Sequence, residues 1–359
     1  MASTKLVLSL AVVSLIGCTD GGMTGDDGGG GDTRPGMTNG VSTLAGWANP
    51  GYLDGNRQVN LFSNPTNVAI GPDGKLYVAD FDNSKLRVVD MEGNASTVVS
   101  TANFQRPFGL VFVGNTLYAS TDNDSTGQHD PIDSTTQMSG AIWRIDIAGK
   151  SATLVADKIG RPRGLCALAD GRIGVADYAH HVIEIVDPTG TVTTLAGTWN
   201  APGQADGAGV AASFNQPYAC AQRPDGKLVV TDWANHKLRS VALDGTVTTL
   251  AGTTAGFADG GLAGAKFNHP QGLTVTKSGD LYVTDIDNYR VRKISSDLST
   301  VSTVAGDGTG GYKDDDDKTA SELYGLEGLS VKPDGTQLFV ADGNRGESVQ
   351  FNRIRMVKL

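Results

Sequence analysis

Short runs of alternating or mostly apolar residues recur along most of the chain, and turn-forming Gly, Asp or Asn residues separate them. The clearest series holds four such runs, at 270–275, 281–285, 288–294 and 301–306. Runs of this length and alternation are typical of β-strands. No long stretch places apolar residues three and four positions apart, as an amphipathic helix requires. We therefore predict an all-β chain with little helix.

The same order of four strands returns six times. Its first strand starts at a proline in five copies and at a leucine in the sixth, namely at Pro65, Pro107, Pro162, Pro217, Pro270 and Leu326. The intervals between these starts are 42, 55, 55, 53 and 56 residues. Four strands at such a period form one blade of a β-propeller. The sequence thus predicts a six-bladed β-propeller over residues 41–359.

The sixth copy contains three strands, of which residues 353–359 form the third. A spare strand, residues 41–46, precedes the first blade and matches the fourth strand of the fifth blade, residues 301–306. Pairing the spare strand with the sixth copy removes two open sheet edges, which would otherwise favour aggregation. We expect the N-terminal strand to complete the last blade.

Several recurring residues are expected to serve the fold. An aspartate ends the second strand in five blades, at Asp80, Asp177, Asp232, Asp285 and Asp342, where its carboxylate can accept backbone N–H bonds of the following turn. The alternation of charged and aliphatic residues in the third strand, Lys85–Val88, predicts that the charged side chains face outward and the aliphatic ones inward. Cys166 and Cys220 follow their prolines by four and three residues, hence on opposite strand faces. We expect two buried thiols there and no disulfide.

The turn, the aspartate, the basic third strand and the Thr-Leu-Ala-Gly fourth strand return together and resemble the NHL-repeat family over residues 41–359. The Gly-His and Trp-Asp signature of WD40 repeats is absent. Some NHL-type propellers are lyases that hold zinc through histidines just after the strand-one proline. The equivalent positions here are Asn67, Gly109, Gly164, Ala219, Gly272 and Gly328. Since none is histidine and no nucleophile motif occurs, a ligand- or protein-binding module is favoured. The alternative is a lyase or hydrolase that uses the channel mouth.

The first residues carry a targeting pattern. Lys5 precedes an apolar run of 11 residues, 6–16, which is shorter than a membrane span and fits a secretory signal. The run ends in Leu-Ile-Gly-Cys at Cys18, which resembles the lipobox of bacterial lipoproteins, although an ordinary signal peptide is the alternative. The resemblance implies a signal peptide at 1–17, a lipid on Cys18 that anchors the protein to a membrane, and a place in the bacterial cell envelope, at the outer membrane or cell surface in a Gram-negative cell. The Gly-rich residues 18–40 are predicted to form a flexible tether.

The long connections are expected on one face of the propeller, which we call the top. They are the segments 47–61, 198–213, 253–266 and 307–322 between blades and the insertion 122–139 within the second blade. Loops of variable length on a rigid scaffold are where binding sites usually lie. Trp47, Trp199, Trp233, Tyr178 and other aromatic residues fall there. They either pack against neighbouring loops or form a platform for a sugar or peptide.

Residues that flank the strand-one proline are expected to ring the mouth of the channel. They are Asn64, Thr66, Arg106, Phe108, Arg161, Arg163, Gln216, Tyr218, His269, Gln271 and Glu327, with Tyr178 and Trp233 nearby on top loops. The formal net charge of −10 argues against a nucleic-acid partner. Three arginines gathered in so acidic a chain indicate a site for the anionic group of a small molecule, a glycan or a peptide terminus. Alternatively, the arginines pair with Glu327, with the aspartates of the tether or with acidic loop residues.

The insertion of the second blade resembles an EF-hand calcium loop. Oxygen-bearing side chains fall at positions 1, 3, 5, 9 and 12, namely Asp122, Asp124, Thr126, Asp130 and Asp133, and a glycine stands at position 6. The loop departs from the pattern in its Asp at position 12, its proline at position 10 and its lack of flanking helices. The sequence therefore leaves two interpretations, a calcium site and an acidic solvated loop.

Residues 312–318, Tyr-Lys-Asp-Asp-Asp-Asp-Lys, look like an epitope tag. They also align with the segments 51–55 and 256–260, in which the repeat itself places Gly, an aromatic residue and Asp. A native loop is the interpretation that this register favours, and an inserted tag is the alternative.

Overall fold

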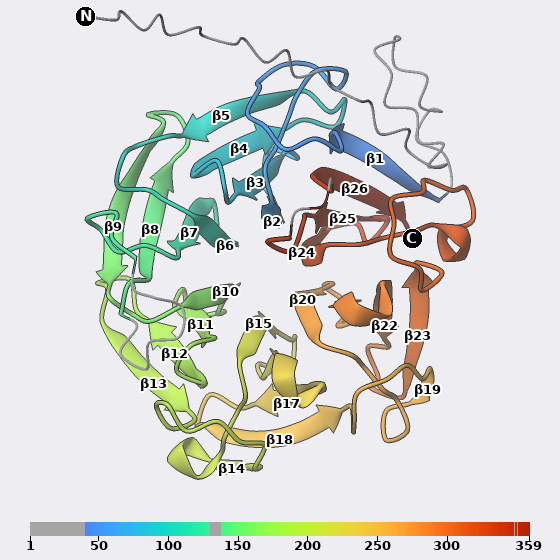
Figure 1. Ribbon diagram of the computed structural model, residues 1–359. Helices are drawn as coiled ribbons and strands as arrows, with labels where there is room; N and C mark the ends of the chain where they lie inside the picture. The colour runs from blue at the N-terminus through green and yellow to red at the C-terminus, as the bar shows by residue number, and fades with distance from the viewer. Residues whose placement is uncertain (1–39, 130–137, 348, 350) are drawn as a thin grey trace, which may run out of the picture. The chain divides into compact units, whose positions relative to one another are not determined.

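The computed structural model describes residues 40–129, 138–347, 349 and 351–359. These residues form six antiparallel sheets, and the first strands of the sheets contact one another in cyclic order around one axis (Figure 1). The predicted six-bladed propeller is confirmed. The described residues contain 26 strands and, as helices, four 3₁₀ turns of three residues each.

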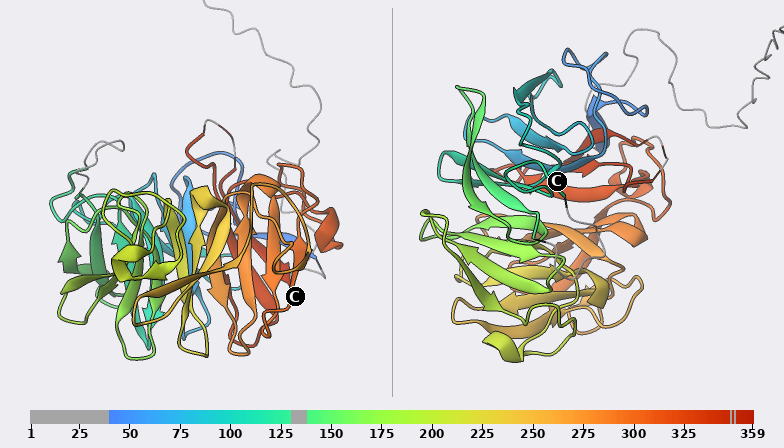
Figure 2. Two further views of the ribbon diagram at one scale, coloured as in Figure 1. Left: turned by 90° about the horizontal axis from the view of Figure 1, so that it is seen from below. Right: turned by 60° about the vertical axis from the view of Figure 1, so that its left-hand side comes forward.

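Each blade is a four-stranded meander. Blades one to three comprise β2 (Pro65–Ile70), β3 (Leu76–Asp80), β4 (Lys85–Val89), β5 (Ala95–Val99); β6 (Pro107–Val113), β7 (Thr116–Thr121), β8 (Ala141–Asp146), β9 (Ser151–Asp157); and β10 (Pro162–Ala167), β11 (Ile173–Asp177), β12 (Val182–Val186), β13 (Val192–Ala196). Blades four to six comprise β15 (Pro217–Gln222), β16 (Leu228–Asp232), β17 (Lys237–Val241), β18 (Thr246–Ala251); β20 (Pro270–Val275), β21 (Leu281–Asp285), β22 (Arg290–Ile294), β23 (Thr300–Ala305); and β24 (Leu326–Val331), β25 (Gln337–Asp342), β26 (Arg353–Lys358), β1 (Val41–Gly46). Figure 2 shows the blades edge-on, with their turns gathered on two opposite faces.

The N-terminal strand closes the ring as predicted. β1 pairs antiparallel with β26, so that Val41 lies opposite Val357 and Gly46 opposite Arg353. All six residues of β1 are buried. The last blade therefore has four strands taken from both ends of the propeller.

The core is divided among the blade interfaces. Six clusters of buried apolar residues occur in the described chain, one between each pair of neighbouring blades. Both faces of a blade are therefore covered by protein. This explains why β3, β11, β12, β16 and β21 are buried at every residue instead of at alternate ones.

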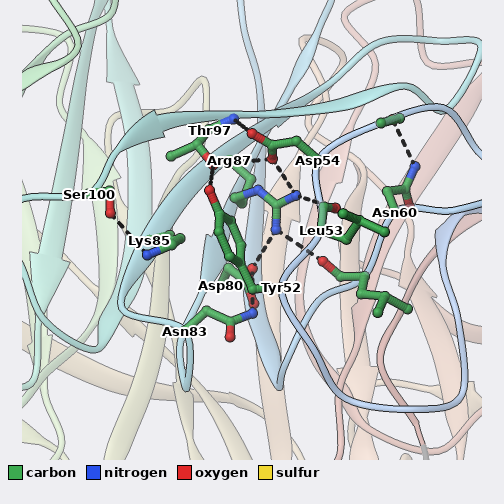
Figure 3. A network of polar contacts seen from close by, with 12 residues as sticks. Tyr52, Leu53, Asp54, Asn60, Asp80, Asn83, Lys85, Arg87, Thr97 and Ser100 are labelled. Atoms are coloured by element: carbon green, nitrogen blue, oxygen red, sulfur yellow. Dashed lines mark hydrogen bonds and ion pairs between the residues drawn. The ribbon is translucent and has the colours of Figure 1, made fainter.

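The outward direction predicted for the charges of β4 is wrong for Arg87, whose side chain is fully buried. Its guanidinium donates to Asp80 at 2.8 Å and to Asp54 of the long preceding loop at 2.7 Å (Figure 3). It also donates to two backbone carbonyls of that loop, at Leu53 and Leu61. Because no face of the blade meets solvent here, the arginine folds against its own loop and fixes that loop in place.

The same arrangement, which we call the arginine clamp, recurs in blades four, five and six. The buried arginines are Arg239, Arg292 and Arg355, and their loop partners are Asp206, Asp259 and Asp314. Asp314 belongs to the segment that resembles a tag, and it takes the same place as Asp54 and Asp259 in their loops. In two of these loops the two residues after the clamped aspartate extend the outer edge of the sheet as β14 (Gly207–Ala208) and β19 (Gly260–Gly261). The loops also contain η1 (Gly209–Ala211) and η4 (Lys318–Ala320), whereas η2 (Trp233–Asn235) and η3 (Ile286–Asn288) follow second strands.

The aspartates that end the second strands are structural, as expected, but their main backbone partners lie elsewhere. Asp80 and Asp232 accept the N–H groups of Ser63 and Asn215 at 2.8 Å. These donors stand just before the first strand of the same blade, whereas Asp177 also accepts the N–H groups of Ala179 and His180 in the following turn, as predicted. The carboxylates thus support the bend that leads each chain segment into the channel.

The expectation of two free thiols is wrong: Cys166 and Cys220 form a disulfide, with their Cα atoms 5.5 Å apart. They lie on β10 and β15, which are neighbouring inner strands. Side chains on opposite faces of two neighbouring blades point toward the same interface. Gly174 leaves room for the bond, since a Cβ there would lie 2.6 Å from the Cys166 sulfur.

Candidate functional site

The inner strands surround a cavity of about 280 Å³ on the propeller axis. Its wall is crowded: a Cβ on Gly164 would lie 2.5 Å from the Cα of Ala219, and one on Gly272 would lie 2.4 Å from the Glu327 carbonyl oxygen. The middle of the wall is apolar and includes Leu165 and Leu329. The cavity is a candidate binding site.

The second residue of each inner strand forms a layer at the top of this cavity, which we call the mouth layer. Its members are Thr66, Phe108, Arg163, Tyr218, Gln271 and Glu327, and all except Gln271 line the cavity. Five of the six are buried, and Tyr218 is partly buried. The layer brings together one cation, one anion and two aromatic rings from different blades.

The cation of the mouth layer belongs to a pair of arginines that share one carboxylate. Asp122, at the end of β7, accepts from Arg161 at 3.1 and 3.2 Å and from Arg163 at 3.5 Å. His129 lies 3.7 Å from the same carboxylate. Burial raises the pKa of Asp122, but Arg163, His129 and Arg161 together outweigh it and lower that pKa well below its usual range. Asp122 is therefore a carboxylate that balances one of two positive charges.

Arg163 has an unused donor. Its Nη1 atom is buried and has no hydrogen-bond partner among the described residues. The guanidinium carbon lies 3.9 Å from the centre of the Phe108 ring, which fixes the plane of the group by a cation–π contact. Burial and the neighbouring charge of Arg161 both lower the pKa of Arg163. A buried N–H group of this kind costs about 1–3 kcal/mol when it is left without an acceptor.

The anion of the mouth layer is Glu327. One of its oxygens, Oε2, accepts from the Tyr218 hydroxyl at 2.8 Å and from the Gln271 amide at 2.6 Å. Burial raises the pKa of Glu327. Both of these donors are neutral, so hydrogen bonding stabilises the carboxylate without balancing its charge.

The remaining predicted residues lie on an outer rim. Trp233 stacks on His269 with ring centres 4.0 Å apart, and Tyr178 contacts both Trp233 and Tyr218. His269 Nδ1 lies 2.5 Å from Oδ2 of Asp287. Arg345 contacts the other carboxylate oxygen of Asp287, Oδ1. The aromatic residues pack against one another here, as one of the two interpretations of the sequence expected.

Asn64, Arg106 and Gln216 are not among the residues that line the cavity, and each contacts a neighbouring turn or loop instead. Asn64 receives the N–H of Asn344 at the seam between the first and last blades. Arg106 lies over the Phe81 ring, and the Gln216 N–H donates to His181. Asn64, Arg106, Gln216 and His269 all have positive φ values, between 51° and 58°. This left-handed conformation turns the chain sharply into the first strand of the blade.

The predicted calcium residues are only partly described. Asp130 and Asp133 lie outside the described residues. Asp122 is bound by the two arginines, and Asp124 accepts from the N–H and the hydroxyl of Thr126 and from the Gln128 N–H. The described residues contain no cluster of three or more His, Cys, Asp or Glu side chains suited to a metal ion. Calcium binding stays a prediction.

The alternative that the mouth arginines pair with an acidic loop residue is confirmed by Asp122, the first residue of the insertion in blade two. Asp122 itself was singled out only as a metal ligand, because its place one residue after β7 does not show that it meets arginines of the next blade. Asp287 and Arg345 were not singled out at all, because they lie in turns after the second strands of different blades. Only the ring geometry brings them together.

Blade three departs from the arginine clamp. Glu184 replaces the arginine and is 2% exposed, with its Oε2 atom lacking a partner among the described residues. Burial, followed by the charge of Asp177, raises the pKa of Glu184 to about 8. His180 Nδ1 lies 2.5 Å from Asp177. Blade three, which carries Arg161 and Arg163, thus also holds a buried acid whose Oε2 atom lacks a partner in the described chain.

Comparison with known proteins agrees with this architecture. The NHL repeat family model matches residues 62–89 and 267–294. Human NHL repeat-containing protein 2 is 26% identical over 314 residues, which cover 83% of this chain and 40% of that protein. The chain therefore spans well under half the length of this relative.

Solved structures share the fold. An auxiliary nutrient binding protein from Bacteroides ovatus superposes with a TM-score of 0.66 at 18% identity, over 88% of this chain and 76% of the other. A gluconolactonase from Xanthomonas campestris gives a TM-score of 0.59 at 15% identity, over 89% of each chain. These structures show the fold alone, whereas the NHL repeat matches, the NHL-repeat relative and the six observed blades together support an NHL-repeat β-propeller.

Proposed function

We propose that this propeller is a binding protein that holds a small anionic molecule at the mouth layer of its central channel. The observation that carries the proposal is Arg163, a residue of the cavity wall whose buried Nη1 atom has no hydrogen-bond partner among the described residues. Two guanidinium groups share the single carboxylate of Asp122, so one positive charge is left for an incoming anion. The nutrient-binding description of the Bacteroides ovatus structure is compatible with this role.

Arg163→Gln tests the proposal, because it removes the charge and leaves Asp122 paired with Arg161. The matched control is Arg172→Gln on the same blade, where Arg172 pairs with Asp170 in an exposed turn. A panel of small carboxylates, sugar acids and inorganic phosphate is titrated calorimetrically. We expect about tenfold to hundredfold weaker binding to Arg163→Gln, equivalent to losing a charged hydrogen bond of about 1.5–3 kcal/mol. Unchanged affinity in Arg163→Gln, or no binding by any anion, would refute the site.

A second candidate function is hydrolysis or lyase chemistry at the mouth. One observation favours it: Asp287 holds the Nδ1 side of His269, the arrangement in which a carboxylate orients a histidine for general-base catalysis. The gluconolactonase is a solved relative of the fold. Hydrolysis of a δ-lactone that is lost in His269→Ala, or stoichiometric zinc or iron in the purified protein, would favour an enzyme.

We also propose that the protein is exported to the bacterial cell envelope and lipid-anchored at Cys18, which lies outside the described residues. The Cys166–Cys220 disulfide supports export, since such bonds persist in oxidising compartments. In the described part of the chain, no helix is sufficiently long and apolar to cross a bilayer. Residues 1–17 and 18–40 then serve as signal peptide and tether.

Calcium is proposed as a ligand of the insertion in blade two. The spacing of the oxygen-bearing side chains supports this proposal. Because Asp122 is bound by arginines, calcium binding requires that Asp122 turn toward the ion or that another oxygen take its place. Asp124→Ala should abolish a calcium-dependent rise in melting temperature. If millimolar calcium does not raise the melting temperature of the parent protein, the calcium site is excluded.

A further inference from the structure

The two charges of the mouth layer face each other across the channel. Arg163 belongs to blade three and Glu327 to blade six, which are opposite positions in a ring of six. Both line the same cavity. No ion pair within 4 Å joins them among the ion pairs of the described residues. The rings of Phe108 and Tyr218, whose centres are 5.6 Å apart, stand in the same layer. The top of the cavity therefore carries a positive and a negative pole that are not joined by an ion pair.

The two poles attract each other through space, and Arg345 also acts on Glu327, but neither pole has a full counter-charge in direct contact. On one side, Arg161 and Arg163 share the single negative charge of Asp122. On the other side, Glu327 receives only the neutral donors Tyr218 and Gln271. Charges in a poorly solvated cavity interact more strongly than in water. A simple anion bound at Arg163 would meet the carboxylate of Glu327, and this repulsion opposes its binding.

The wall below the poles has a different character. Leu165, Leu273 and Leu329 line it together with the disulfide of Cys166 and Cys220. Such a surface favours an apolar group and offers little to a second charge. The cavity thus combines two opposite poles at its top with a wall that is partly aliphatic and also carries the polar residues Asn67, Thr274 and Ser330.

We propose that the ligand is a small dipolar acid with three parts: an anionic group for Arg163, an ammonium or hydroxyl group that donates to Glu327, and a short apolar body against the leucines. This inference rests on the proposed binding function and specifies its ligand class. Amino acids and hydroxy acids share the required chemistry, and the probes below distinguish them.

Three probes with one carbon skeleton test the inference on the full chain: L-leucine, 2-hydroxy-4-methylpentanoate and 4-methylpentanoate. They carry an ammonium, a hydroxyl and no donor, respectively, beside the same tail and carboxylate. We expect at least one of the first two to bind tenfold or more tightly than 4-methylpentanoate in calorimetric titrations. The stronger of the two identifies the donor.

Glu327→Gln should abolish this preference, because the amide no longer attracts a cation and offers a weaker acceptor. Glu92→Gln, at an exposed turn, is the matched control and should keep the preference. Thermal unfolding verifies that Glu327→Gln is folded. Because the repulsion from the Glu327 carboxylate is removed, 4-methylpentanoate should bind the folded Glu327→Gln protein at least as tightly as the parent.

The outcomes distinguish a failure of the dipolar-ligand inference from a failure of the proposed anion-binding function. Equal affinities for the three probes in the parent, or a preference that persists in Glu327→Gln, would overturn the dipolar ligand and leave Arg163-dependent anion binding intact. The dipolar ligand is also overturned if none of the three binds while another anion still binds through Arg163. If no anion of the panel binds, the proposed function itself fails.

Discussion

Glu184→Gln should make the stability of the propeller less dependent on pH. Glu184 is 2% exposed, and its pKa is raised from 4.5 to about 8 by burial and by the charge of Asp177. A carboxyl group with a raised pKa in the folded state contributes stability below its unfolded pKa and loses that contribution as the pH rises through the folded value. The contribution of Glu184 is therefore complete below about pH 4.5 and lost by about pH 8.

The size of the effect follows from the difference between the unfolded and folded pKa values of Glu184. Each pH unit between the two pKa values changes the free energy of unfolding by about 1.4 kcal/mol, so the whole interval amounts to several kcal/mol, on the order of 5. Glutamine has nearly the same shape and cannot ionise. We expect Glu184→Gln to match the parent near pH 5 and to exceed its free energy of unfolding by a few kcal/mol at pH 8 to 9.

Guanidinium unfolding followed by tryptophan fluorescence at a series of pH values measures the difference. Glu92→Gln, in an exposed turn, is the control and should track the parent at every pH. A difference between Glu184→Gln and the parent that does not change between pH 5 and 9 would refute the argument. It would show that the Glu184 carboxyl is not held neutral by its surroundings.

Three further predictions concern the frame of the propeller and its anchor. Replacing both Cys166 and Cys220 by serine should lower the free energy of unfolding by about 4 kcal/mol, as chain entropy gives for a bond that closes a loop of 54 residues; a melting temperature equal to that of the parent would contradict it. Deleting residues 41–46 should destabilise the whole ring, whereas deleting 19–40 should leave the melting temperature nearly unchanged, and equal melting of the two deletions would count against closure by β1. Cys18→Ser should abolish membrane partitioning, and a mutant that stays in the membrane fraction after signal processing would disprove the lipid anchor.

The blade pattern could be predicted because it depends on local features. Each strand is short and bounded by turns, and the strand-one proline recurs, so the sequence alone indicated six blades and their closure by residues 41–46. The mouth layer also followed, since the residue after each proline occupies the same level of the ring. These inferences need only the repeat and the geometry of one blade.

The predictions that were wrong concern contacts between neighbouring blades. Arg87 was expected outside because alternation usually reports one solvent face, whereas neighbouring blades cover both faces of β4. Cys166 and Cys220 were expected apart because opposite faces cannot meet within one sheet, but they do meet between two sheets. The pairing of Asp122 with Arg161 likewise joins two blades. Contacts between blades are set by the ring and leave little trace in the repeat.

A structure of the protein with the tightest-binding acid of the panel tests the central claim most directly. The account predicts the ligand inside the central channel, with an anionic oxygen within hydrogen-bonding distance of Arg163 Nη1 and its apolar part toward Leu165 and Leu329. A ligand bound instead at the outer rim near Trp233, or on the long loops, with the channel empty, would contradict it.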